Sequence, residues 1–178
     1  MRQSARSPNA TLPKNGGGAT IETITNRVGA ALSPDRIRLD LSVANKNQVL
    51  EEAARLFTLV EGCEPTLVAA SLAAREALGS TGLGHGFAIP HARLKGLRRA
   101  VAAFLRPKFA VPFDAPDGKP VSDVLVLLLP EQAAEEHLEL LAQAAEMFNE
   151  RRFRDHLHHQ SDAPSLYQAL VDWPAIAE

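Results

Sequence analysis

The chain has 178 residues, a length that suits one domain with terminal extensions better than two domains with separate cores. Hydrophobic residues make up 46% of it and charged residues 22%, a balance typical of a globular protein that buries a core. The formal net charge of −2 gives no overall attraction to nucleic acid or to an anionic membrane, so any site for an anion must be local.

The single cysteine and the first twenty residues bear on where the protein resides. Cys63 has no second cysteine for a disulfide, and no Cys/His cluster with zinc-site spacing surrounds it. Residues 1–20 lack the apolar segment of a signal peptide, and the sequence contains no run of roughly 18 apolar residues for a spanning helix. We therefore expect a cytoplasmic protein without a membrane partner, with a flexible tail over residues 1–20 and one domain over residues 21–178.

Apolar side chains recur with strand or helical spacing along the first half of the chain. Gly62 and Gly79 mark two helix ends, and Pro65 suits the first position of the second helix. The expected elements are a short amphipathic segment over residues 21–32, a half-buried strand over 37–41, and helices over 46–61 and 65–78.

The second half predicts the centre of a sheet and more helices that cover it. Residues 113–120 have the composition of a turn between two apolar runs, which are joined as a hairpin or by a crossover. The expected elements are strands over residues 100–105 and 121–129, and helices over 133–148, 151–158 and 164–171. The apolar stripe of the first of these helices is expected at Leu138, Leu141, Ala145 and Phe148. This mixture predicts a single α/β domain with a central mixed sheet flanked by helices on both faces.

A glycine-rich segment follows the second helix. Residues 79–86 contain four glycines, which oppose a stable helix and favour a loop whose backbone wraps a ligand. His91 ends this segment after Pro90, and the proline is expected to hold the imidazole on a stiff, exposed loop. A neutral imidazole is nucleophilic near pH 7 and forms covalent intermediates. His91 is therefore the candidate nucleophile, and phosphoryl transfer is the candidate reaction.

The flanks of this loop carry groups that can stabilise a phosphoryl group. The transfer depends on positioning and on neutralising charge on three oxygens, so it needs donors and cations. Loop amides can form an anion-binding concavity, and Ser80 and Thr81 add hydroxyl donors. The nearby cations are Arg75, Arg93, Lys95, Arg98 and Arg99. Few aromatic residues are available for stacking on bases, so we expect Arg93 and Lys95 to bind an acidic partner protein and not nucleic acid.

The sequence also predicts where a second histidine, His137, lies. His137 falls in the first turn of the helix expected over residues 133–148, three and four residues before Leu140 and Leu141. We expect it to point inward or along the sheet edge. A helix N-terminus disfavours a cation, so a neutral imidazole that donates a hydrogen bond is favoured there.

Two patterns resemble the phosphohistidine motif of the fructose/mannitol-type (type-2) EIIA family of the bacterial phosphotransferase system: Gly84-x-Gly86-x-Ala88-x-Pro90-His91 and, before it, Arg75-Glu76-x-x-Gly79-Ser80-Thr81. The resemblance implies that His91 is phosphorylated, that Arg75 contacts the phosphoryl group and that His137 is a second active-site histidine. We expect no cofactor and no metal at this site. Support for the phosphoryl group is expected from Ser80, Thr81, Gly84 and Gly86.

The resemblance covers about residues 39–171, and residues 113–121 are most similar to the nitrogen-regulatory branch of the family. That branch implies a phosphoryl donor called NPr, an HPr-like phosphocarrier, and regulated targets such as kinases or transporters. Two alternatives stay open. One is a sugar-specific EIIA that passes phosphate to a cognate EIIB, and the other is a pure protein-binding regulator in which the phosphoryl charge changes an interface. The oligomeric state also stays open, with a weak homo-oligomer among the options.

His85 departs from the family pattern, in which Asn or another polar residue is common between the two glycines. We interpret it as tolerated variation that brings a second imidazole close to His91. A metal site built from His85, His91 and His137 is a weaker interpretation, because their spacing is not a recognised ligand pattern. A dinucleotide-binding loop is disfavoured because Pro90 opposes entry into a helix.

Overall fold

A computed structural model of the chain describes residues 26–132 and 135–173. The tail predicted over residues 1–20 lies outside the described residues. So do residues 21–25 of the predicted amphipathic segment, the first two residues of the helix predicted over 133–148, and the last five residues of the predicted domain.

The strands in the described part of the chain are β1 (Ile37–Leu41), β2 (Gly82–Gly84), β3 (Phe87–Ala88), β4 (His91–Leu94), β5 (Val101–Pro107) and β6 (Asp123–Pro130). They form one sheet in the order β1-β5-β6-β3-β2, with β4 also paired to β6. β5 and β6 are antiparallel neighbours in a hairpin, whereas β1 is parallel to β5, and β3 and β4 are parallel to β6. The predicted mixed sheet is confirmed, and the connection between its two longest strands is the hairpin alternative.

The helices are α1 (Arg27–Ala31), α2 (Lys46–Leu56), α3 (Pro65–Ala77), α4 (Glu135–Asn149), α5 (Arg151–His158) and α6 (Ala163–Asp172), with a short 3-10 turn at Pro34–Arg36. Side-chain caps begin several of them. The carboxylate of Glu64 accepts the amide hydrogens of Thr66 and Leu67 at the start of α3, and Asp162 caps α6 through Ser165. None of these helices has the length and apolar content to cross a bilayer.

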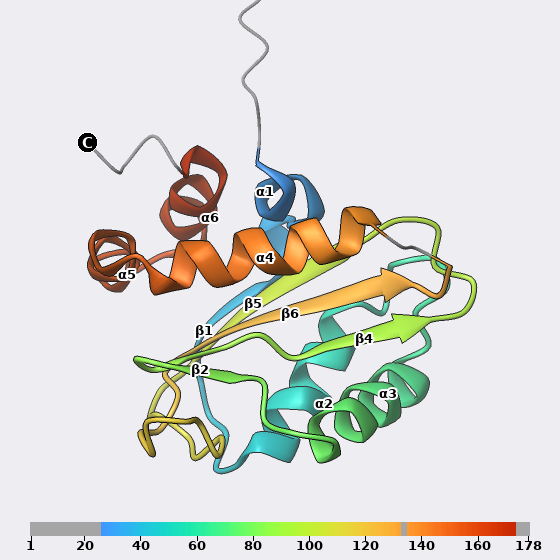
Figure 1. Cartoon of the computed structure of the whole chain (residues 1–178), viewed down its shortest axis with the longest axis horizontal. Coiled ribbons are helices and arrows are strands. Elements are labelled where there is room, and N and C mark those ends of the chain that lie inside the picture. Colours follow the sequence, from blue (N-terminus) through green and yellow to red (C-terminus); the bar gives the residue numbers. More distant parts are fainter. Residues whose placement is uncertain (1–25, 133–134, 174–178) are drawn as a thin grey trace, which may run out of the picture.

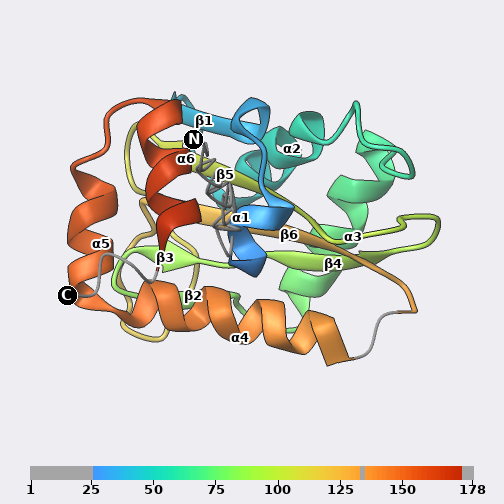
Figure 2. The same ribbon diagram turned by 90° about the horizontal axis from the view of Figure 1, so that it is seen from above.

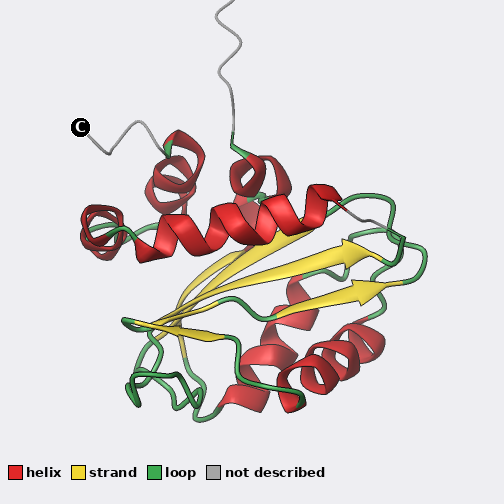
Figure 3. Cartoon of the chain, viewed as in Figure 1, coloured by secondary structure: helices red, strands yellow, loops and turns green. Residues whose placement is uncertain are grey.

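Helices cover both faces of the sheet, as predicted. Figures 1 and 3 show α1, α4, α5 and α6 on one face and α2 and α3 on the other. Alternate residues of β5 and β6 enter two separate cores. Phe104 and Leu127 join the core under α4 and α6, while Leu105 and Leu128 join the core under α2 and α3. Both strands are apolar along nearly their whole length because neither face meets water.

Two predicted details are wrong. The helix predicted over residues 46–61 ends at Leu56, because Phe57 turns into the core and the Thr58 hydroxyl donates to the Arg55 carbonyl, which competes with a further helical turn. The predicted stripe of α4 is shifted by one residue, since Leu138 is 65% exposed. The buried side chains of α4 are His137, Leu140, Ala144, Met147 and Phe148. A polar residue thus occupies the first position of the core stripe.

A buried ion pair fastens α5 to the sheet. Asp123, at the start of β6, is fully buried and accepts from Arg106 Nε on β5 at 2.6 Å and from the Ser122 hydroxyl at 2.9 Å. The same guanidinium donates to the carbonyls of Leu157 and Gln160 at the end of α5. The pair is therefore hydrogen-bonded on most sides, which a buried charge requires.

Replacing Asp123 with alanine should lower the free energy of unfolding by about 3–5 kcal/mol, because it strands the Arg106 guanidinium in the interior. Urea denaturation followed by circular dichroism measures the loss. The matched control is Glu61→Ala, which breaks the exposed pair with Arg98 and should change the free energy by less than about 1 kcal/mol. Equal losses in the two variants would contradict the structural role given to the buried pair.

Candidate functional site

The candidate nucleophile lies on a strand. His91 is the first residue of β4 and pairs with Leu127 of β6, whose amide hydrogen is donated to the Pro90 carbonyl at 2.9 Å. Its side chain is half buried, so the predicted exposed loop is wrong. The reason is that Ala92 and Leu94 alternate into the core and continue the line of β3 along β6. In the described residues β4 pairs with β6 alone, so His91 lies at an edge of the sheet.

The hydrogen bond of the imidazole identifies its free nitrogen. His91 Nδ1 lies 2.9 Å from the carbonyl oxygen of Ile89. A carbonyl oxygen only accepts, so Nδ1 carries the hydrogen and Nε2 keeps its lone pair. Nε2 is the nucleophilic atom of this tautomer.

A cavity of about 350 Å³ adjoins His91, and Figure 2 shows α4 running alongside the strands that form this edge of the sheet. Its walls come from α3, β4, β6 and α4. The lining residues are Ser71, Arg75, His91, Ala92, Arg93, Leu129, His137, Leu138 and Leu141. The structure thus brings together His91, Arg75 and His137, along with Arg93.

Positive charge and burial together keep His91 neutral. Burial lowers the pKa of His91 below its ordinary value of 6.5, and the cations Arg75 and Arg93 lower it further. The Ile89 carbonyl and the Glu76 carboxylate act in the opposite direction without reversing the shift. A neutral, nucleophilic imidazole is therefore favoured at pH 7.

His137 lies where the sequence predicted it, in the first turn of α4, and is 5% exposed. Its Nδ1 is buried and has no hydrogen-bond partner among the described residues. Burial lowers the pKa of His137, and Arg93 lowers it further against a smaller opposing effect of Glu136. The ring is thus neutral and holds an unused polar atom beside the cavity.

Two glycines of the motif, Gly84 and Gly86, form the turn between β2 and β3. Gly84 and Gly86 have φ values of +87° and +84° at the tip of the β2–β3 hairpin, a conformation that glycine adopts without strain. Asp117 packs against this tip, and its Oδ2 accepts the amide hydrogen of His85 at 2.8 Å. Neither glycine is among the described residues that line the cavity, and neither is His85. Phosphoryl support from Gly84 and Gly86 stays a prediction that this geometry does not favour.

Ser80 and Thr81 use their hydroxyls within the fold. The Ser80 hydroxyl donates to the Phe113 carbonyl, and the Thr81 hydroxyl donates to Glu76 Oε2 at 2.5 Å. Neither residue lines the described cavity. Their predicted contact with the phosphoryl group is not tested, but the Thr81 carbonyl accepts from the amide of Ile89, which ties this segment to His91.

Glu76 is a residue of the site that sequence reasoning missed. It is 6% exposed, and it accepts the Thr81 amide hydrogen at 3.1 Å and the Lys46 ammonium at 3.4 Å. Its charge acts on His91, as noted above. The signal was present in the sequence, because Glu76 follows Arg75 directly within the motif and falls on the apolar face of α3. A carboxylate at a core position is seldom there without a partner.

The cations predicted near the loop are divided between two places. Arg75 and Arg93 line the cavity with His91, whereas Lys95, Arg98 and Arg99 line a neighbouring groove. Within residues 26–132 and 135–173, no three His, Cys, Asp or Glu side chains gather in a way that could hold a metal ion.

Comparison with known proteins identifies the family to which this fold belongs. The family model for the phosphoenolpyruvate-dependent sugar phosphotransferase system, EIIA 2, matches residues 30–173. The nitrogen regulatory protein of Pseudomonas aeruginosa is 43% identical over 147 residues, 82% of this chain and 96% of that protein. The nitrogen regulatory protein of Escherichia coli is 30% identical over 149 residues, 83% and 91% of the two chains.

Solved structures of IIA proteins have the same fold as this chain. The crystal structure of the nitrogen regulatory protein IIA-Ntr from Neisseria meningitidis aligns with a TM-score of 0.77 at 43% identity, over 80% of this chain and 98% of that one. The mannitol IIA of Escherichia coli shares the fold, with a TM-score of 0.64 at 18% identity over 78% of this chain and 97% of that one.

The chain therefore belongs to the type-2 EIIA family of the phosphotransferase system, whose members are phosphocarrier components that exchange phosphate with partner proteins. Within that family it is a homologue of the nitrogen-regulatory IIA-Ntr proteins. The predicted family and branch are both confirmed.

Replacing Glu76 with glutamine should lower the pKa of His91 further, because it removes an anion that favours the imidazolium. A pH titration of the His91 imidazole signals by NMR measures the shift. The matched control is Asp114→Asn, which removes the other acidic partner of Lys46 and should leave the pKa of His91 nearly unchanged. A His91 pKa that rises in Glu76→Gln would contradict the electrostatic role of Glu76.

The two depressed pKa values also predict how stability changes with pH. Below about pH 6.5 the unfolded chain binds protons at His91 and His137 that the native state resists, so the free energy of unfolding should fall with pH from that point. His137→Asn should reduce the fall. Urea denaturation of both proteins at pH 7.5 and pH 5.5 measures it, and an unchanged difference between the two pH values would refute the contribution of His137.

Proposed function

We propose that the protein is a phosphocarrier of the nitrogen-related phosphotransferase system, which accepts a phosphoryl group on His91 and acts on target proteins according to its phosphorylation state. One observation carries the proposal. His91 Nε2 is left free by the Nδ1 bond to Ile89, next to a cavity that also holds Arg75, Arg93 and His137.

The proposed phosphoryl transfer requires few reactive groups from the protein. The lone pair of His91 Nε2 forms a bond to the phosphorus of the donor's phosphohistidine, and the phosphorus–nitrogen bond of the donor breaks, leaving its electron pair on the donor imidazole. His91 needs no deprotonation, because burial and the two cations keep its pKa low. Positioning and charge neutralisation are then the main requirements.

The cavity supplies that neutralisation. Arg75 is held at the end of α3 by a 3.0 Å bond from its guanidinium to the Gly79 carbonyl, which fixes one donor and leaves others free. Arg93 extends from β4 two residues after the nucleophile. Both are suited to the equatorial oxygens of a phosphoryl group, and the ring of His137, which lines the same cavity, is suited to a third contact.

The partners follow from the branch and from the surface. We further propose an HPr-like phosphocarrier, NPr, as donor, regulated proteins such as kinases or transporters as targets, and a cytoplasmic relay. The similarity to nitrogen regulatory proteins supports the branch on which these proposals rest. Leu138 is 65% exposed and lines the cavity beside Arg93, so an apolar contact and a cation flank the nucleophile where a donor must dock. Lys95, which directly follows the last residue of β4, remains a proposed contact for a partner protein.

Incubation with phosphoenolpyruvate, the nitrogen-branch Enzyme I and NPr should add one phosphoryl group, seen by intact-mass spectrometry. His91→Ala should take none. His85→Ala is the matched control and should be labelled at the wild-type rate, because His85 lies on the hairpin tip outside the cavity. Arg75→Ala should fold and be labelled at least about 100-fold more slowly, as expected for the loss of one charge-stabilising donor.

Labelling of His91→Ala, or no labelling of wild type while NPr itself is phosphorylated, would refute this relay. Transfer onward to a fructose or mannitol EIIB would instead favour the sugar-specific alternative. A mannitol IIA has been solved in complex with its phosphorylated IIB, which shows that partnership for that protein. A His91→Asp variant that reproduces the regulatory effect without turnover would favour a pure binding regulator.

A further inference from the structure

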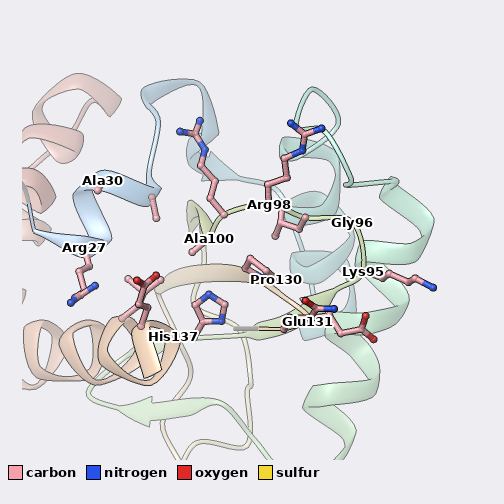
Figure 4. Close-up of a pocket in the computed structure, with 15 residues that line it drawn as sticks. Arg27, Ala30, Lys95, Gly96, Arg98, Ala100, Pro130, Glu131 and His137 are labelled. Carbon is pink, nitrogen blue, oxygen red and sulfur yellow. The ribbon is translucent and has the colours of Figure 1, made fainter. Parts of the chain in front are cut away.

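A groove of about 860 Å³ lies next to the cavity of His91, and His137 lines both. Its walls are α1, the turn that follows β4, the end of β6 and the first turns of α4. Figure 4 shows His137 in the groove, with Arg27 to one side of it and Arg98 above it. The volume is within the range of about 300–1,000 Å³ that small-molecule sites occupy.

The rim of the groove is rich in cations. It contains Arg27, Lys95, Arg98 and Arg99 against two acids, Glu131 and Glu136. Arg98 is paired with Glu61 at 3.3 Å in an exposed contact, and Arg27 is paired with Glu139. Exposed pairs of this kind open readily, since they are worth little in water.

Arg99 is, like Lys95, a cation of the rim without an ion-pair partner among the described residues. It has no hydrogen bond or ion pair with any described residue, and it lies close enough to Arg36 that the two repel. Burial lowers the pKa of Arg36, and the charge of Arg99 lowers it further. Arg36 is itself held in place by hydrogen bonds to the carbonyls of Ala31 and Ala102. An anion between α1 and this turn would relieve the repulsion.

The second observation is the orphan atom of His137. This side chain is 5% exposed, and its Nδ1 has no partner in the part of the chain that the structure describes. A buried imidazole nitrogen without a hydrogen bond is uncommon and costs free energy. A ligand on the groove floor would lie against this ring.

We propose that this groove binds a small anion bearing at least two phosphate or carboxylate groups, which contacts Arg99 and the ring of His137. None of the large exposed hydrophobic side chains of the described chain lines the groove. A protein partner would need such anchors, whereas a small polyanion needs the arginine donors that are present. The apolar residues of the wall are mostly small, as at Ala30, Ala31 and Ala100.

The position of His137 gives the ligand a regulatory consequence, and this part rests on the proposed phosphocarrier function. An anion beside His137 favours its protonated form, which would bind a phosphoryl group on His91 more strongly. By reciprocity, phosphorylation of His91 changes the affinity of the groove for the anion. Binding itself does not depend on phosphotransfer.

Calorimetric titration of the unphosphorylated chain at physiological ionic strength tests the site, with pyrophosphate in one series and citrate in another. At least one anion should bind, and His137 imidazole signals should shift in NMR spectra. Arg99→Glu should weaken binding about tenfold or more through loss of charge-assisted bonds. Lys108→Glu is the matched control at the opposite end of β5 and should stay within about twofold of wild type.

The His91 cavity could also attract an anion, and Arg75→Ala separates the two sites. Affinity kept in Arg75→Ala and lost in Arg99→Glu supports the groove. The reverse pattern, or no binding of either anion to the wild type, overturns the proposal. Arg98→Gln serves as a second groove variant if thermal melts show that Arg99→Glu does not fold. Because the titration uses unphosphorylated protein, failure of the relay leaves this result interpretable.

Discussion

Burial of β6 on both faces is the constraint that positions the site. Val124, Val126 and Leu128 face the helices α2 and α3, while the residues between them face α4 and α6. β6 pairs with β5 along one edge and with β3 and β4 in succession along the other. Because β4 is paired with the second half of β6, from Leu127 to Pro130, the backbone of His91 cannot shift without breaking hydrogen bonds of the sheet in a dry interior. A sheet edge therefore holds the nucleophile, which is a more rigid support than a loop.

Electrostatics then sets what the held imidazole can do. Arg75 and Arg93 disfavour the imidazolium of His91, and in the proposed transfer the same two cations would face the negative oxygens of the phosphoryl group. Glu76, a buried carboxylate nearby, opposes the effect of these cations on His91 and ties α3 to the segment whose Thr81 carbonyl accepts the amide hydrogen of Ile89. Ile89 in turn accepts from His91 Nδ1. Glu76 thus links α3, which carries Arg75, to the segment that fixes the tautomer of His91.

Much of this could be predicted from sequence. The strands β5 and β6 and the helix α5 follow from apolar runs and periodicity, and three residues of the cavity, His91, Arg75 and His137, follow from a motif resemblance. The strand character of His91 could not be predicted, because a four-residue strand after proline and glycines depends on pairing with β6, a long-range contact that local pattern does not contain. The stripe of α4 was misplaced for a related reason. Hydrophobicity alone favours Leu138, whereas the fold buries His137 and leaves Leu138 largely exposed.

The local sequence placed five cations near the nucleophile, and the fold divides them at His137. Arg75 and Arg93 remain on one side of this ring, and Lys95, Arg98 and Arg99 turn to the other because the chain reverses direction after β4. Two positive surfaces therefore share one neutral, buried imidazole with an unused nitrogen. An anion on either side raises the affinity of that ring for a proton, and a proton on the ring favours an anion on the other side. In the proposed arrangement, His137 is thereby the residue through which the His91 cavity and the neighbouring groove act on each other.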